Sequence, residues 1–382
     1  MKKLEKNFSL ILIGAWILIG LGAGLISNSA PLLSKDVKTG EWFFLKEAGS
    51  FQDRAIILGT PVPFGPKELD LSIPKFSKPG TESLKYPGKV HYLGTDAVGR
   101  DILAALVHGA RFSLLIVFFS ALGIGIIGLL IGSIMGYFGD HFLRPKAPLF
   151  WASVFRISMT IFWLSKLGLF TGILLSGFLA IFLWSLARIR SFKAYIFRSS
   201  RVSVPIDFAL NRFMETFEAI PQLFLLLVII SIMPPGPTRL LTALILAGWL
   251  TLAKIVRSKT LSFRSSALHE NLEALGASNF KKVFNHNFFF VLPDLLAYVA
   301  YAAGNVVMLE SGLTFLGLGV SPEQVSWGKI LSYSMLKPDY WWLAVVPGIL
   351  IFAVVFSLIR VGNRIYQKLL PEHRNWRYYD LA

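Results

Sequence analysis

Cysteine is absent from the sequence, so the chain can form no disulfide and offers no thiolate ligand to a metal. Three signatures of catalysis are missing as well: the Gly-x-x-x-x-Gly-Lys-Ser/Thr phosphate loop, the His-Glu-x-x-His zinc motif and the Gly-x-Ser-x-Gly nucleophile elbow. The six histidines never pair at the spacing of metal ligands. We therefore predict no catalytic residue, no metal site and no cofactor in this chain. Energy for any active transport then has to come from a partner or an ion gradient.

Acidic residues are scarce, because 38 lysines and arginines stand against 22 aspartates and glutamates, a formal net charge of +16. Between Asn28 and Val107 the two signs nearly balance, with ten basic and nine acidic residues. The positive excess lies in short groups beside apolar stretches, as the positive-inside rule expects of cytoplasmic loops. A nucleic-acid site would gather those residues on one face, so we expect no nucleic acid among the partners.

Hydrophobic residues make up 54% of the chain, and the mean hydropathy of +0.60 lies above that of soluble domains. A membrane-spanning helix needs about 20 mostly apolar residues. The sequence predicts an all-α membrane protein with about six core transmembrane helices and both termini in the cytoplasm. The expected helices are Phe8–Ile26, Phe112–Met135, Ala219–Met233, Leu240–Ala253, Phe289–Leu309 and Trp341–Ile359.

The first apolar stretch, Phe8–Ile26, could instead be a signal peptide, because Lys2, Lys3 and Lys6 precede it. Its apolar run is longer than the core of a typical signal peptide, and no Ala-x-Ala cleavage site follows. We therefore expect a retained transmembrane helix in residues 1–27.

A segment without long helices should follow on the outer side of the membrane. Residues 28–107 contain many prolines, which disfavour helices, and short strands such as Ala55–Leu58 are expected there. The second membrane helix lies within residues 108–139. Its glycines Gly128, Gly132 and Gly136 form a smooth stripe, which lets helices approach closely in lipid.

Residues 140–206 have basic residues on both flanks, so they should cross the membrane an even number of times. We expect a helical hairpin made of Pro148–Leu164 and Leu167–Ala187, although Arg156 lies in the middle of the first helix and is costly in lipid. The alternative is that both segments lie at the membrane surface and neither crosses it.

The rest of the chain, residues 207–370, should hold the core of the protein, followed by a cytoplasmic tail, 371–382. An amphipathic lead-in, Asp207–Glu218, precedes the membrane helices. The prolines at 234–237 force an outer turn. A polar cytoplasmic loop is expected at 257–288, and a glycine-rich loop, Gly312–Trp327, on the outer side.

Three blocks of sequence carry a specific resemblance. They are YLGTDAVGRDIL at Tyr92–Leu103 with GARFSL at Gly109–Leu114, then LGAS at Leu275–Ser278, and finally LESGLTFLGLGV at Leu309–Val320 with SWG at Ser326–Gly328. In this order and spacing they resemble the C-type inner-membrane permeases of the dipeptide/oligopeptide/nickel ABC-transporter family. The resemblance covers nearly the whole chain except Asp140–Pro205, and it implies the type I ABC importer permease fold.

The first and third blocks supply candidate residues for the outer mouth of a pore. Thr95 or Asp96 is a good N-cap for a helix that runs towards Gly109, and the resemblance places this helix at the outer mouth. A simple capping role is the alternative there, and an interfacial carboxylate is the alternative for the glutamate of the third block. The candidates are Asp96, Arg100, Asp101, Glu310 and Phe315.

The middle block is the candidate for coupling to an ATPase. In this family a cytoplasmic helix–turn–helix with the pattern Glu-Ala-Ala, three residues, then Gly docks into a groove on the ATPase. Glu270 and Gly276 have that spacing here, but Asn271 and Leu272 replace the alanines, and Leu292-Pro293 follows His286 about one helical turn late. The glycine should end the first helix and let the chain turn. The predicted coupling residues are Glu270, Ala274, Gly276, Ala277 and Ser278.

The resemblance implies a permease subunit of an ATP-driven importer for peptides or similar small solutes, in the bacterial inner membrane. Expected partners are a homologous B-type permease, two ABC ATPases that bind ATP and Mg, an extracytoplasmic solute-binding protein and membrane lipid. The pattern Arg212–Glu215 with Pro221–Leu225 is similar to the oligopeptide and microcin uptake branch. Two alternatives remain: an ion-coupled transporter, which would need carboxylates or histidines inside its helices, and a non-transporting scaffold that keeps the fold.

Overall fold

The structure is a computed structural model that describes residues 2–36, 42–44, 54–86, 88–141, 145–167, 177, 179, 200, 202–319, 321 and 324–369. The chain divides into two compact units. The larger unit comprises Met1–Ser133 and Ile220–Ala382, and the smaller one comprises Ile134–Ala219. Each unit is described by itself below.

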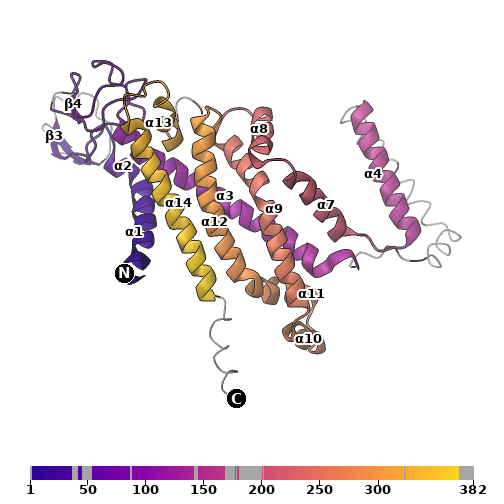
Figure 1. Ribbon diagram of the computed structural model, residues 1–382. Coiled ribbons are helices and arrows are strands. Elements are labelled where there is room, and N and C mark those ends of the chain that lie inside the picture. Colours follow the sequence, from indigo (N-terminus) through magenta and orange to yellow (C-terminus); the bar gives the residue numbers. More distant parts are fainter. Residues whose placement is uncertain are drawn as a thin grey trace. The chain divides into compact units, whose positions relative to one another are not determined.

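Helices dominate the larger unit, and α9, α12 and α14 lie side by side with α12 between the other two (Figure 1). In lipid such helices are held by close packing and hydrogen bonds rather than by the hydrophobic effect. The helices of this unit are α1 (Lys2–Leu21), α2 (Ala23–Ile26), α3 (Ile102–Phe138), α8 (Gln222–Ile232), α9 (Pro237–Arg264), α10 (Ala267–Ala274), α11 (Asn279–Lys281), the π-helix η3 (Lys282–Asn287), α12 (Phe288–Phe315), α13 (Trp327–Tyr333) and α14 (Trp342–Leu369). The last residues of α3 belong to the smaller unit.

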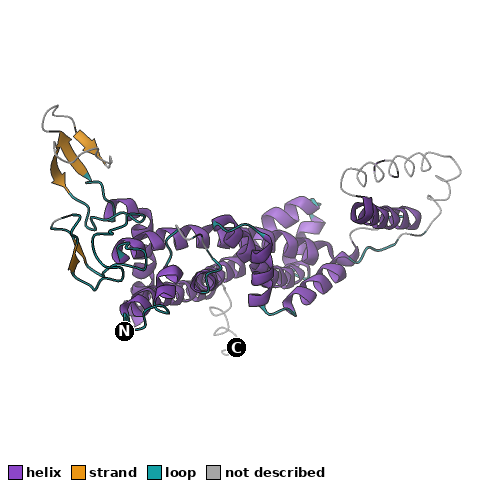
Figure 2. Ribbon diagram, turned by 90° about the horizontal axis from the view of Figure 1, so that it is seen from above, coloured by secondary structure: helices purple, strands orange, loops and turns teal. Residues whose placement is uncertain are grey.

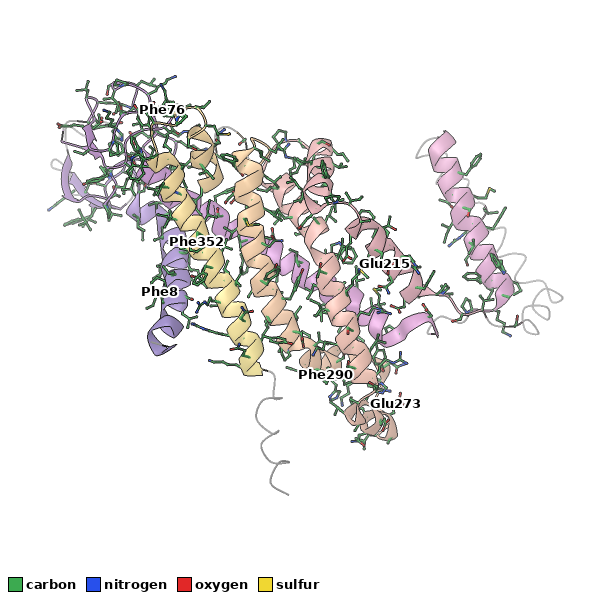
Figure 3. The ribbon with its side chains drawn as sticks, in the orientation of Figure 1. Phe8, Phe76, Glu215, Glu273, Phe290 and Phe352 are labelled. Carbon is green, nitrogen blue, oxygen red and sulfur yellow. The ribbon has the colours of Figure 1, made fainter. Side chains whose placement is uncertain are left out.

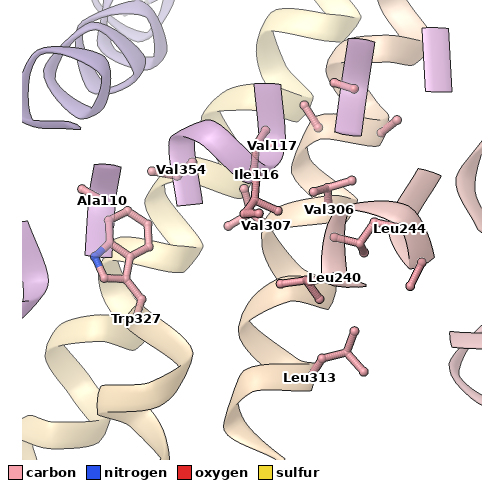
Figure 4. Packing of buried hydrophobic residues seen from close by; sticks show 14 of the residues in the cluster. Ala110, Ile116, Val117, Leu240, Leu244, Val306, Val307, Leu313, Trp327 and Val354 are labelled. Atoms are coloured by element: carbon pink, nitrogen blue, oxygen red, sulfur yellow. The ribbon is translucent and has the colours of Figure 1, made fainter. Parts of the chain in front are cut away.

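A large buried hydrophobic cluster contains side chains of α1, α3, α8, α9, α12, α13 and α14. Figure 4 shows Ile116 and Val117 of α3 in this cluster with Val306 and Val307 of α12. Leu244 of α9 belongs to the same cluster and is 2% exposed. The core therefore lies where α3, α9 and α12 meet.

Glycines let α3 approach α9 closely, as the stripe in the sequence predicts. A Cβ atom added at Gly128 would lie 2.7 Å from Cγ of Leu252, and one at Gly132 would lie 2.4 Å from the carbonyl oxygen of Ala253. Neither position has room for a side chain, so the prediction is confirmed for these two glycines. Gly136 belongs to the smaller unit.

Four helical stretches among the described residues are long and apolar enough to cross a membrane, or up to five if α7 and α8 form one broken span. The four are Ile102–Phe138, Pro237–Arg264, Asn279–Phe315 and Trp342–Lys368. The apolar part of α1, Phe8–Leu21, is shorter than a span, and α8 has only 11 residues. By length and composition the structure thus supports fewer spans than the six expected, within an all-helical membrane core.

Several helices run further than their apolar stretches predict. Helix α9 continues beyond Ala253 to Arg264, and α12 continues beyond Leu309 to Phe315. The predicted glycine-rich loop therefore begins at Leu316 and not at Gly312. A glycine within a helix costs only about 1 kcal/mol relative to alanine, and the buried neighbours Leu313 and Thr314 keep the last turn of α12 in place.

Short strands occur in residues 28–107, where the many prolines exclude long helices. We call these residues the outer segment, after the side of the membrane predicted for them. Strand β1 (Leu33–Asp36) pairs antiparallel with both β2 (Trp42–Phe44) and β3 (Arg54–Leu58), which confirms the expected strand at Ala55–Leu58. A second antiparallel pair joins β4 (Thr81–Glu82) to β5 (Val90–His91). Figure 2 shows the strands apart from the helices of the same unit.

The smaller unit contains the end of α3, the 3-10 helix η2 (Gly139–His141), α4 (Ala147–Leu167) and α7 (Ile206–Glu218). Helix α7 confirms the amphipathic lead-in, and the Asp140 carboxylate accepts a hydrogen bond from its backbone at Phe208, 3.1 Å away. The first half of the predicted hairpin is helical in α4, but α4 is not among the candidate spans. Most of Leu167–Ala187 lies outside the described residues, so the number of crossings remains a prediction.

Candidate functional site

The first block of the resemblance forms the start of the long helix α3. The side chain of Asp101 accepts a hydrogen bond from the backbone N–H of Ala104 at 2.7 Å and thereby caps the helix. The expectation that Thr95 or Asp96 provides this cap is wrong. Asp96 instead closes the preceding turn, because its Oδ1 accepts hydrogen bonds from the backbone of Val98 at 2.8 Å and of Arg100 at 2.9 Å.

A buried cluster of charged groups fastens the outer segment to this helix start. The imidazole of His91 lies between two carboxylates, with Nδ1 2.8 Å from Oδ2 of Asp101 and Nε2 3.2 Å from Oδ2 of Asp70. All three side chains are at most 2% exposed. The ring of Phe64 stacks on the imidazole at a centroid distance of 4.0 Å. We call Asp70, His91 and Asp101 the outer clamp.

The outer clamp requires a positively charged imidazole. Ionised carboxylates only accept hydrogen bonds, and a neutral imidazole has a single N–H, so both contacts can form only when both ring nitrogens carry protons. Burial opposes the charge on His91, but the hydrogen bonds to Asp101 and Asp70 outweigh it and raise the pKa of the imidazole. Burial also opposes the charge on Asp70, yet hydrogen bonds from Ser72, Ser83 and His91 lower its pKa to about 2.

Sequence reasoning singled out Asp101 and missed both of its partners in the outer clamp. Asp70 and His91 lie 21 positions apart in a segment rich in turns, and no periodic pattern links them. Among the described residues, no group of three acidic or histidine side chains could hold a metal ion. The outer clamp is therefore a hydrogen-bonded ionic cluster that positions the segment in front of α3.

An aromatic contact joins the outer segment to α13 and to the residues just before α14. Phe76 has a backbone φ of 58°, a region that residues other than glycine rarely adopt. Its ring lies 6.4 Å from that of Tyr333 on α13 and 6.1 Å from that of Tyr340, which precedes α14. Figure 3 labels Phe76 among the side chains of the outer segment, next to α13. The segment is thus held against α3 and α13 at separate points.

Glu310 lies in the interior of the core, and α12 continues past it. Its side chain is fully buried. Ser113 of α3 donates a hydrogen bond to Oε2 at 3.0 Å, and Ser311 and Thr314 of α12 donate at 3.3 and 3.4 Å. Phe315 is the half-buried last residue of α12. In this structure Glu310 joins two helices, and a role of either residue in lining a pore remains a prediction.

The third block contains a tryptophan that holds α13 against the core. Trp327 is 2% exposed, and its indole N–H donates to the carbonyl oxygen of Leu106 in α3 at 2.9 Å. A Cβ atom at Gly109 would lie 2.9 Å from this ring, and one at Gly328 would lie 2.3 Å from the carbonyl oxygen of Ser311. The glycines of the first and third blocks therefore allow α3, α12 and α13 to touch.

Two of the candidate coupling residues, Glu270 and Ala274, lie in α10, and Gly276, Ala277 and Ser278 form the turn that follows it. Gly276 has a φ of 69°, as the prediction of a helix-ending glycine requires. The backbone N–H of Ala277 donates to Leu272 at 3.0 Å, and that of Gly276 donates to Glu273 at 2.9 Å. These two bonds form a Schellman motif, which ends a helix with a left-handed residue. The prediction for Gly276 is confirmed.

The side chains around this turn face away from the core. Leu275 is 81% exposed and Phe280, on the other side of the turn, is 71% exposed. Glu270, Ala274 and Ser278 are exposed as well, whereas Ala277 is half-buried. Figure 3 labels Glu273 on α10, which projects beyond the end of α9. We call Ser266–Lys281 the docking segment.

Comparison with protein-family models identifies residues 193–371 as a "Binding-protein-dependent transport system inner membrane component". This range contains the docking segment, Glu310 and all of α9, α12 and α13. Just under half of the chain thus matches the inner-membrane components of binding-protein-dependent transport systems. Together with the apolar helices described above, this match makes the chain a multi-pass membrane subunit for transport rather than an enzyme.

Individual relatives extend the similarity beyond the matched domain. The permease is 26% identical to the dipeptide transport system permease protein DppC of Alkalihalophilus pseudofirmus, over 76% of this chain and 75% of that protein. It is 22% identical to the inner membrane ABC transporter permease protein YejE of Escherichia coli, over 93% and 90%. It is 24% identical to the oligopeptide transport system permease protein OppC of Haemophilus influenzae, over 74% and 71%. The resemblance to C-type peptide permeases is thus confirmed.

A solved structure gives a weaker likeness. A chain of the MetNI methionine ABC transporter in an inward-facing conformation matches with a TM-score of 0.43 and 15% sequence identity, over 70% of this permease and 98% of that chain. The architecture described above rests on the permease's own helices and on the family match.

Proposed function

We propose that this permease imports peptides or similar small solutes across the bacterial inner membrane. It forms the translocation path together with a homologous B-type permease. Two cytoplasmic ATPases bind ATP and Mg, and an extracytoplasmic solute-binding protein delivers the cargo. Both termini and the docking segment lie in the cytoplasm, and residues 28–107 lie on the outer side. The peptide cargo is inferred from the dipeptide and oligopeptide transport systems of the DppC and OppC relatives.

The observation that carries this proposal is the shape of the docking segment. A Schellman turn fixes the angle at which the chain leaves α10, and exposed apolar side chains stand on both sides of it. A large exposed side chain such as Leu275 gains little in water, whereas a groove on a partner would bury it and stabilise the contact. The segment continues directly into α12, so a partner bound there would be connected to the membrane core.

The charge pattern favours this function over the two alternatives. An ion-coupled transporter would need ionisable residues inside its helices to carry the ion. The acidic residues in the membrane portion of α12 are Asp294 near its start, paired with Lys259, and Glu310 among hydroxyl groups. Both are engaged in contacts between helices. A scaffold without transport function would have no use for an exposed apolar docking turn.

The test replaces the glycine on which the docking turn depends. Gly276→Val places a β-branched side chain at a positive φ, which costs about 1–3 kcal/mol of backbone strain, although nothing lies within 4 Å of the new Cβ atom. We expect the variant to insert into the membrane normally. The amount of ATPase that co-purifies with it through an affinity tag should fall at least about five-fold. Solute uptake by cells that carry the variant should fall in parallel.

Two matched variants control for the substitution. Gly276→Asn should behave as the unaltered chain, because asparagine tolerates the left-handed region. Gly88→Val introduces the same kind of strain at a φ of 80° in the outer segment, also with open space around the Cβ position, and should leave ATPase retention unchanged. Normal ATPase retention and uptake in Gly276→Val would contradict docking through this segment and favour the scaffold.

A further inference from the structure

The docking segment is connected to the membrane core through an unusual helical turn. Residues Lys282–Asn287 form the π-helix η3, between α11 and α12. Wide turns of this kind are rare, and they often mark functional positions inside helices. The chain stays helical from Asn279 to Phe315. In the direction of α12, a displacement of the docking segment therefore passes along the chain through this turn, and the other end of the segment is continuous with α9.

The last residue of the π-helix forms a buried polar contact with two other helices. Asn287 is fully buried, and its Nδ2 lies 3.2 Å from Oγ1 of Thr260 on α9 and 3.4 Å from Oγ of Ser133 on α3. Thr260 is fully buried too, and Ser133 is 7% exposed. Burial of an amide costs stability unless hydrogen bonds compensate. An apolar residue would fill this position at lower cost, so the amide fixes a specific arrangement of three helices.

The other end of the same amide is unsatisfied. Oδ1 of Asn287 is buried and has no hydrogen-bond partner among the described residues. Rotating the amide by half a turn would not remove the problem, because the two hydroxyl groups can donate or accept and the NH₂ group would then be unpaired. A buried acceptor without a partner is unfavourable. The contact is therefore only partly satisfied in this arrangement of the helices, and a shift that supplies a second partner would be favoured.

An ion pair beside this contact keeps α9 and α12 together. Nζ of Lys259 lies 3.5 Å from Oδ2 of Asp294. Lys259 precedes Thr260 on α9, and Asp294 follows Asn287 by two helical turns on α12. The two helices are thus joined at two levels, while α3 is joined at this end through Ser133 and Asn287. Asn287 is the point at which all three helices and the π-helix meet.

We propose that Asn287 is a positioning residue that passes movement of the docking segment to α3 and α9. When an ATPase moves the docking segment, the π-helix transmits the displacement to α12, and the amide draws Thr260 and Ser133 with it. This inference rests on the proposed function, because it needs an ATPase at the docking segment. It assigns no contact with either the ATPase or the solute to Asn287.

The test measures how far a nucleotide-dependent movement reaches into the membrane core. The chain has no cysteine, so spin labels can be attached to cysteines introduced at Leu130 on α3 and at Phe352 on α14, a helix that the Asn287 contact does not join; these positions are 44% and 68% exposed. The assembled transporter is isolated from its own bacterium, and the distance between the labels is measured with and without ATP and vanadate. In Asn287→Leu we expect the population with the nucleotide-dependent distance to fall at least about five-fold, with ATPase retention unchanged.

Variants at the partners of Asn287 provide a second measurement and a control. Thr260→Val removes one hydroxyl partner and should also weaken the nucleotide-dependent distance change. The double variant Asn287→Leu with Thr260→Val should weaken this change little further than Asn287→Leu alone, because both substitutions break the same contact. Thr251→Val makes the same change at an exposed position of α9 and should leave the response intact. If Asn287→Leu fails to insert, Thr260→Val decides.

The possible failures are distinguishable. If no ATPase co-purifies with the unaltered chain, the proposed function is wrong. If ATPase is retained and the full distance change persists in Asn287→Leu, or in Thr260→Val where Asn287→Leu does not insert, the role of Asn287 is wrong while the proposed function stands. A loss of the response accompanied by an equal loss of ATPase retention would show that Asn287 supports docking itself, and would also overturn the positioning role.

Discussion

The outer segment and the docking segment are both attached to the same core helices, but they are attached by opposite means. The outer segment uses the outer clamp, in which each charged group has an oppositely charged partner and exposure is at most 2%. The docking segment joins the core through a π-helix whose last residue leaves a buried oxygen unpaired, and it exposes large apolar side chains. One attachment is satisfied within the chain, and the other is incomplete without a partner.

This difference shows how a membrane subunit can hold one extramembranous region still and leave another responsive. Buried, fully paired charges make a rigid attachment, because removal of any partner leaves a charge stranded in a poorly solvated place. Exposed contacts and a partly satisfied amide can change at little cost. The outer segment should therefore keep its shape without partners, whereas the docking segment should become fixed when an ATPase binds.

The largest effect is expected when the outer clamp loses its central carboxylate. Asp101→Ala removes both the cap of α3 and one carboxylate partner of His91, so we expect a loss of about 3–5 kcal/mol in the local stability of residues 70–101. Asp101→Asn keeps a capping side chain and should lose less. Hydrogen exchange of the backbone amides in this range measures both. Equal loss in the two variants would mean that the charge, and not the cap, holds the segment.

The pH dependence of the outer clamp is the next test. The pKa of His91 is raised in the folded state, so the clamp is fully stabilising below the usual histidine value of 6.5 and loses stability as the pH rises through the folded value. The pKa of Asp70 is lowered from 3.8 to about 2, so its contribution of about 2 kcal/mol is present above pH 3.8 and is lost as the pH falls towards 2. Stability of the segment should therefore be highest between pH 3.8 and pH 6.5.

Hydrogen-exchange protection factors, corrected for the intrinsic rate at each pH, test this window. Protection of residues 70–101 should decline on the alkaline side, and His91→Gln should lack that decline because glutamine does not titrate. The carboxylates of the docking segment, Glu270 and Glu273, are exposed, so we expect a smaller change in protection there. A parallel decline in both segments would indicate general loosening of the protein and not titration of His91.

How much of this arrangement the sequence predicts depends on whether a feature is local. The apolar runs predict the helices, and the spacing of Glu270 and Gly276 predicts a turn that the structure confirms, because a helix-ending glycine acts through its own backbone. The extension of α9 to Arg264 was missed, since packing sustains a helix beyond its apolar stretch. The outer clamp and the contact of Asn287 could not be predicted, because they join residues that are distant in sequence and follow no periodic pattern.

The smallest effect is expected for the same chemical change in the docking segment. Glu273 lies 3.2 Å from Nζ of Lys282 and 3.9 Å from the imidazole of His269, so it resembles Asp101 in having both a basic partner and a place beside a helix end. Its side chain, however, is 59% exposed. The side chain of Lys282 is only 6% exposed, but water and salt reach the carboxylate and screen the pair, and ordering two flexible side chains offsets much of the attraction. Hydrogen bonding to Lys282 lowers the pKa of Glu273, but exposure makes this a weak source of stability.

Glu273→Gln should therefore change the exchange protection of residues 266–287 by less than about two-fold, whereas Asp101→Asn should produce a larger loss in residues 70–101. The two variants are compared in the isolated chain, in the same detergent and at the same ionic strength. Raising the salt concentration should leave the effect of Asp101→Asn nearly unchanged, because its partners are buried. If Glu273→Gln loosens its segment as much as Asp101→Asn does, the docking segment is held by its own charges, and the contrast between a fixed outer region and a responsive inner one does not hold.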